Sequence, residues 1–70
     1  MTFYEWLLTI TDRDNPIGDF ARDAQSDSKF PQEANSWEEL NDYLENHTHA
    51  VNRAIEAGHD AFVEYKQSQC

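Results

Sequence analysis

The chain has 70 residues, of which 14 are acidic and 5 are basic, so its formal net charge at pH 7 is −9. This charge weighs against direct binding to nucleic acid or to an anionic membrane, since both present negative charge. A domain of this size buries only about 60% of the surface that its unfolded chain exposes, and the lone Cys70 provides no disulfide framework. Nearly every large apolar side chain is therefore needed for a core of packed helices.

The first predicted helix begins after Thr2. This residue stands three positions before Glu5, which is the spacing of a capping box. The apolar side chains that follow recur at helical spacing on one face: Phe3, Trp6, Leu7 and Ile10. Tyr4 and Leu8 lie one turn apart at the edge of this face. They are either covered by the last helix or left as a patch that binds a partner or a second copy.

The second predicted helix runs from Pro16 to about Ser26. Asn15 can cap it, and proline suits the first helical position because its missing N–H would have no partner there. Apolar residues again recur at helical spacing: Ile17, Phe20, Ala21 and Ala24. The following stretch, SDSKFPQEANS, has no sustained period and contains Pro31, so we predict a loop that is anchored by Phe30.

The third predicted helix begins after Ser36, which has capping-box spacing to Glu39. Its inner stripe consists of Trp37, Leu40 and Leu44. The opposite, solvated ridge consists of Glu38, Asp42 and Glu45. Tyr43 lies at the border between these faces, so it can contribute both to the core and to a binding surface.

The last predicted helix runs from about Thr48 to Lys66 and has the strongest apolar period in the chain. Its inner face consists of Val51, Ala54, Ile55, Gly58, Ala61, Phe62 and Tyr65. Gly58 would allow a close neighbour, but a glycine also costs about 1 kcal/mol relative to alanine, so the helix could bend or break there. Across the four helices we expect these residues to be buried: Trp6, Phe20, Trp37, Leu40, Leu44, Ile55 and Phe62.

Four motifs, in this order, carry a family resemblance: FYEWLL, IGDFARDAQSD, KFP and WEELNDYLE. They resemble the YozE-like family of short bacterial proteins with a sterile-alpha-motif-like (SAM-like) fold. The resemblance covers most of the chain and is weaker in the tail, where HDAFVEY stands in place of an Asp-Glu-Ala-Trp-like segment. It implies an all-α fold, a compact bundle of four or five short helices, with residues 1–70 forming one domain. It supplies no activity, cofactor or catalytic residue.

The sequence predicts neither a metal site nor an enzyme. Metal-ligand residue types occur at His47, His49, His59 and Asp60. These residues lack the i, i+4 spacing of a helical zinc site, and no cysteine joins them. The acidic pairs lie at solvated positions, where a shifted catalytic pKa is not expected, and Cys70 has no neighbouring base. We therefore expect no metal, no cofactor and no catalytic residue.

The N-terminal segment has no basic residues before its apolar centre and no small-residue cleavage site after it, so we expect no signal peptide. No apolar run approaches the roughly 20 residues that span a bilayer. We therefore expect a cytoplasmic protein that is not bound to a membrane. Its oligomeric state is left open between a monomer and a weak homo-oligomer.

The function favoured by the sequence is a non-enzymatic protein–protein interaction module. The five basic residues are scattered and form no stripe, so we expect no direct binding to nucleic acid. An unknown protein partner is expected, and charge favours a basic one. The candidate interaction surface consists of Tyr4, Leu8, Glu38, Asp42, Tyr43 and Glu45. The alternative is a regulatory nucleic-acid-associated protein, or an acidic DNA mimic, that acts through a basic partner.

Overall fold

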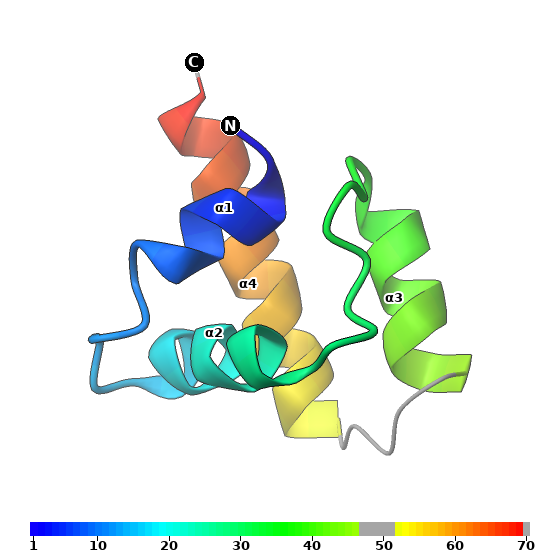
Figure 1. The fold of residues 1–70 in the computed structure, drawn as a ribbon, viewed down its shortest axis with the longest axis horizontal. Helices are drawn as coiled ribbons and strands as arrows, with labels where there is room; N and C mark the ends of the chain where they lie inside the picture. The colour runs from blue at the N-terminus through cyan, green and yellow to red at the C-terminus, as the bar shows by residue number, and fades with distance from the viewer. Residues whose placement is uncertain (47–51, 70) are drawn as a thin grey trace.

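A computed structural model describes residues 1–46 and 52–69, and these residues form four helices and no strand (Figure 1). The helices are α1 (Phe3–Leu8), α2 (Pro16–Ser26), α3 (Trp37–Asn46) and α4 (Asn52–Ser68). α4 packs against each of the other three helices, whereas α3, among the described helices, packs closely only against α4. Figure 1 shows α3 standing apart from α1 and α2. The predicted all-α, SAM-like bundle is confirmed.

The predicted helix starts are also confirmed by their caps. The Thr2 hydroxyl accepts a hydrogen bond from the Glu5 N–H at 3.1 Å, and the Glu5 carboxylate accepts one from the Thr2 N–H at 2.8 Å. The Asn15 side chain accepts one from the Gly18 N–H at 2.8 Å. The Ser36 hydroxyl accepts one from the Glu39 N–H at 3.3 Å. The predicted start of the last helix near Thr48 lies outside the described residues.

Gly58 does not interrupt α4, which is continuous from Asn52 to Ser68. A Cβ atom at Gly58 would lie 2.8 Å from a ring carbon of Phe20, a distance that real Cβ atoms do not tolerate. The glycine therefore lies where the Phe20 ring of α2 packs directly against the backbone of α4. Of the two interpretations of Gly58, close approach is correct and a break in the helix is wrong.

Phe30, on the segment between α2 and α3, is the aromatic anchor that the sequence predicts. Its side chain is only 5% exposed. Its ring centroid lies 5.7 Å from that of Tyr4 on α1, 6.2 Å from Phe20 on α2 and 6.0 Å from Tyr43 on α3. One residue outside the helices therefore connects three of them.

A second aromatic group joins the first helix to the last. The rings of Phe3 and Trp6 on α1 lie 5.5 and 5.9 Å from the ring of Tyr65 on α4. The Tyr65 hydroxyl also donates a hydrogen bond to the Met1 carbonyl at 2.6 Å. These contacts close the bundle between residues that are far apart in the sequence.

Two of the residues predicted to be buried are only half-buried, namely Trp37 and Ile55. The other five are buried as predicted: Trp6, Phe20, Leu40, Leu44 and Phe62. On α4, Ala57 is buried and Gly58 lies against the Phe20 ring of α2, whereas Ile55 packs against the edge of the core and stays partly exposed. Trp37 and Ile55 lie at the open edge of the contact between α3 and α4.

We predict that Phe30→Ala lowers the free energy of unfolding by about 3–5 kcal/mol, because it leaves a cavity among three helices. Urea denaturation followed by far-UV circular dichroism measures this loss. Val63→Ala is the control, since Val63 is 42% exposed and its truncation should change stability by less than about 0.5 kcal/mol. Equal midpoints for the two variants would contradict the role given to Phe30.

We predict that Gly58→Ala destabilises the protein, although alanine is intrinsically favoured in a helix by about 1 kcal/mol. The added methyl group would press on the Phe20 ring, and overpacking of this kind costs about 1–3 kcal/mol. Thermal unfolding of Gly58→Ala beside Gln67→Ala, an exposed position in the same helix, measures the effect. A raised melting temperature for Gly58→Ala would show that α2 and α4 are not so closely packed.

Candidate functional site

Tyr4 and Leu8, the apolar part of the predicted surface, have different environments. Tyr4 is half-buried against Phe30, while Leu8 remains 38% exposed. The ring that packs on Tyr4 thus belongs to the connecting segment, whereas α4 packs against α1 through Tyr65. Covering of both residues by the last helix, one of the two expectations, is therefore wrong for Leu8. An exposed Leu8 is compatible with an interface, which stays a prediction.

Tyr43 lies on the same aromatic group, because its ring packs on Phe30 from α3. Its hydroxyl donates a hydrogen bond to the Asp27 carboxylate. This bond, together with burial and the negative charge of Asp27, raises the pKa of Tyr43 to about 12. The structure therefore brings Tyr4 and Tyr43 together around Phe30, although they lie on different helices.

The acidic part of the predicted surface lies elsewhere on α3. Glu38, Asp42 and Glu45 are all exposed. At about 100° per residue they lie roughly 100–160° around the helix from Tyr43. The six predicted residues therefore form two separate surfaces rather than one.

A cleft that the sequence did not predict lies between α3 and α4. It has a volume of about 360 Å³ and is lined by Trp37, Asn41, Ile55, Glu56, His59 and Asp60. The Trp37 ring meets the His59 ring edge-to-face, with 5.0 Å between the centroids. Helical periodicity had assigned Trp37 and Ile55 to the core. It indicates which side of a helix faces inward, but not how closely two helices approach along their length.

The charges that line this cleft are acidic. Glu56 and Asp60 are exposed and stand one turn apart on α4, and neither lysine nor arginine is among the lining residues. Among the described residues, the ion pairs join Arg13 to Glu64 at 2.7 Å and Arg22 to Asp19. Neither carboxylate at the cleft takes part in them.

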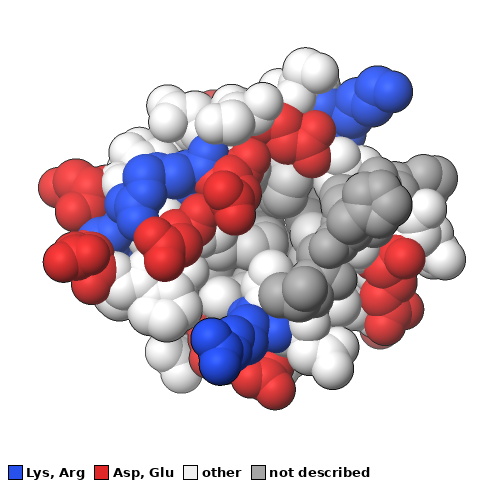
Figure 2. All heavy atoms as spheres, turned by 90° about the horizontal axis from the view of Figure 1, so that it is seen from below, with Lys and Arg blue, Asp and Glu red and all other residues white. Residues whose placement is uncertain are grey.

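On the face seen in Figure 2, charges of both signs are mixed. Figure 2 shows a row of acidic side chains on the lower face, with basic side chains on both sides of it. A second groove, of about 290 Å³, lies between α2 and α4, with Asp19, Asp23 and Arg53 among its lining residues. This mixture offers no basic stripe on the lower face for a phosphate backbone.

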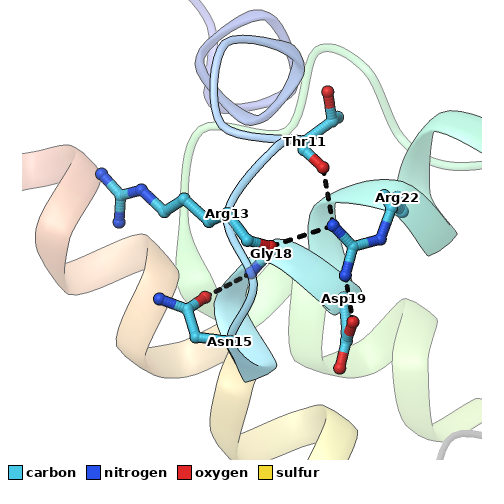
Figure 3. Close-up of polar contacts among 6 residues, drawn as sticks. All are labelled: Thr11, Arg13, Asn15, Gly18, Asp19 and Arg22. Carbon is cyan, nitrogen blue, oxygen red and sulfur yellow. Dashed lines mark hydrogen bonds and ion pairs between the residues drawn. The ribbon is translucent and has the colours of Figure 1, made fainter.

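Arg22 is held by the fold rather than free for a ligand (Figure 3). Its guanidinium donates hydrogen bonds to the carbonyls of Thr11 and Arg13 at 2.7 and 2.9 Å, and it also contacts Asp19. Gly18 lies against the same turn, where a Cβ atom would be 1.9 Å from the Arg13 carbonyl oxygen. The hydrogen bonds from Arg22 and the close packing of Gly18 thereby fix the turn between α1 and α2 against α2.

Only one of the three histidines that were considered as metal ligands and rejected lies within the described residues. His47 and His49 lie outside the described residues, and His59 packs on Trp37. Within residues 1–46 and 52–69, no three His, Cys, Asp or Glu side chains form a group that could hold a metal ion. None of the helices in these ranges is long and apolar enough to cross a membrane.

Comparison with known proteins identifies similar chains. The family described as the YozE SAM-like fold matches residues 2–67. A UPF0346 protein of Lactobacillus acidophilus is 44% identical over 46 residues, which cover 63% of this chain and 60% of that protein. A UPF0346 protein of Leuconostoc mesenteroides is 39% identical over 49 residues, which cover 67% of this chain and 65% of that protein. The chain thus spans 60% and 65% of the lengths of these relatives. No solved structure matches it significantly.

We predict that the stability supplied by the Tyr43–Asp27 hydrogen bond is lost at alkaline pH. The pKa of Tyr43 is raised from about 10 to about 12, so the contribution is complete below about pH 10 and disappears as the pH rises through about 12. Urea denaturation across this interval should show a smaller decline for Tyr43→Phe than for the unmodified protein. Tyr4→Phe, which removes a hydroxyl from the other side of Phe30, should decline like the unmodified protein. An equal decline in the free energy of unfolding for the unmodified protein and both variants would contradict a stabilising hydrogen bond between Tyr43 and Asp27.

Proposed function

The chain belongs to the family with the YozE SAM-like fold, a bacterial family of unknown function, and from this premise we propose that it is a non-enzymatic protein-interaction module. A shared fold does not transfer function, so the proposal depends on the site. We place the binding site in the cleft between α3 and α4. The half-buried Trp37 beside Ile55 in this cleft is the observation that carries the proposal.

Leaving these two side chains half-covered has a cost in so small a domain. Burial of apolar surface contributes about 25 cal/mol per Å², and a 70-residue chain has little such surface to spare. Tryptophan is also among the residues most enriched at the energetic centres of protein interfaces. A partner that covers Trp37 and Ile55 would recover the burial that the isolated domain lacks.

The chemistry of the cleft supports binding rather than catalysis. Its lining comes from only two helices, so it is a groove rather than an enclosed pocket. No polar or charged side chain is buried among the described residues. Burial is one of the main ways in which a protein shifts a pKa for acid–base catalysis, and this groove does not provide it.

The partner that the charges favour is basic. Glu56 and Asp60 border the groove, and the whole chain carries a net charge of −9. Opposite charge on a partner would accelerate association, and like charge disfavours a second copy of this chain. The alternative of an acidic DNA mimic needs regularly spaced carboxylates, and it is less favoured because basic side chains flank the acidic row in Figure 2.

We predict that Asn41→Arg, which places a long cationic side chain in the groove, abolishes capture of the partner. Tagged protein is incubated with host lysate, with and without nuclease treatment, and bound proteins are quantified by mass spectrometry. The matched control is Gln25→Arg, the same type of substitution at an exposed position of α2. We expect the control to retain the partner and Asn41→Arg to lose it about tenfold or more, which corresponds to about 1.4 kcal/mol.

Circular dichroism and melting temperature establish first that both variants are folded. Equal capture of the same protein by both variants would contradict a binding site in this groove. Loss of capture by every form after nuclease treatment would favour the nucleic-acid-associated alternative.

A further inference from the structure

We infer that the α3–α4 groove recognises an arginine side chain on its protein partner, with the guanidinium packed on Trp37 and held by Glu56 and Asp60. This inference rests on the proposed function and names the chemistry of the partner. The three residues line the same groove, two from α4 and one from α3. Together they offer an aromatic surface beside two carboxylates.

The aromatic surface is suited to a cation. Trp37 is half-buried and lines the groove, and its ring centroid lies 5.0 Å from that of His59, edge-to-face, and 6.4 Å from that of Phe62. The indole ring binds cations better than the other aromatic side chains do, through the negative face of its π-system. A guanidinium is planar and weakly hydrated, and can therefore stack on the ring while its N–H groups point outward, parallel to the ring, toward other acceptors.

The two carboxylates supply acceptors for those N–H groups. Glu56 and Asp60 are four residues apart, which places them on neighbouring turns of α4 about 5–6 Å apart at Cβ. Like charges at this spacing repel each other, and neither carboxylate has an ion-pair partner among the described residues. A guanidinium has five N–H donors arranged as a fork, so it can bond to both carboxylates and relieve the repulsion.

None of the three arginines of this chain forms an ion pair with these carboxylates. Arg13 is paired with Glu64 at 2.7 Å, and Arg22 donates to main-chain carbonyls at 2.7 and 2.9 Å. Arg53 lines the neighbouring groove together with Glu56 and Asp60, without forming an ion pair with either. The arginine must therefore come from another protein. A nucleic acid or a second copy is disfavoured because each would bring negative charge to these carboxylates.

The inference is tested by titrating the full chain, labelled with ¹⁵N, with synthetic capped peptides Gly-Ser-Leu-X-Leu-Ser-Gly, in which X is arginine, lysine or citrulline. Citrulline keeps the shape of arginine and removes its charge. The arginine peptide should shift the signals of the Trp37 indole N–H, the Asn41 side-chain amide and the α4 amides around Glu56 and Asp60. We expect the citrulline peptide to bind roughly tenfold more weakly, and the lysine peptide to have intermediate affinity.

Paired variants test the role of the carboxylates. Glu56→Gln combined with Asp60→Asn should lose most of the preference for arginine over citrulline. The control combines Asp12→Asn with Asp14→Asn, which removes the same charge from exposed positions in the turn between α1 and α2, and should keep the preference. Increasing salt should weaken binding of the arginine peptide to the unmodified protein more than binding of the citrulline peptide.

Three outcomes would overturn the inference: no shifts in the groove with the arginine peptide, equal affinity for the arginine and citrulline peptides, or an equal loss of preference in both paired variants. These outcomes are distinct from failure of the proposed function. If Asn41→Arg still abolishes partner capture, the groove remains a docking site that recognises something other than arginine.

Discussion

The packing of the Phe30 ring against three helices is the interaction on which the rest of the structure depends. Because α3 does not pack closely against α1 or α2, its position relative to them is set through Phe30 and through its contact with α4. The hydrogen bond from Tyr43 to Asp27 strengthens the link on the same side. α3 is thus held along one edge. Its other edge, which carries Trp37 and Asn41, is where the contact with α4 opens into the groove.

The close approach at Gly58 determines the other side of that groove. With no side chain at this position, the Phe20 ring of α2 reaches the backbone of α4 and turns its apolar face toward α2. Ala57 is buried in the core, and the half-buried Ile55 lines the groove between α4 and α3. The groove therefore depends on how the helices pack at Phe30 and at Gly58. Neither of these residues lines the groove itself.

Local sequence signals predicted much of the fold, because capping and periodicity act within a few residues of each other. Thr2, Asn15 and Ser36 were correctly placed at helix starts, and Phe30 was correctly identified as an anchor. The candidate site was less predictable. A helical period cannot report the separation between two helices, so Trp37 was assigned to the core. It also could not show that Tyr4 and Tyr43, which lie on different helices, meet around one ring.

The contacts that join α1 to α4 have a consequence for how the chain folds. The hydrogen bond from Tyr65 to Met1 connects residues 64 positions apart, and Phe3 packs on the same tyrosine. An isolated helix of six residues is too short to be stable in water, so α1 depends on its packing against α2 and on these distant partners in α4. Closing so long a loop is entropically costly and slows folding relative to bundles with mainly local contacts. During synthesis on the ribosome, α1 can pack on α2 early, but it remains without its contacts to Tyr65 until the second half of α4 has emerged.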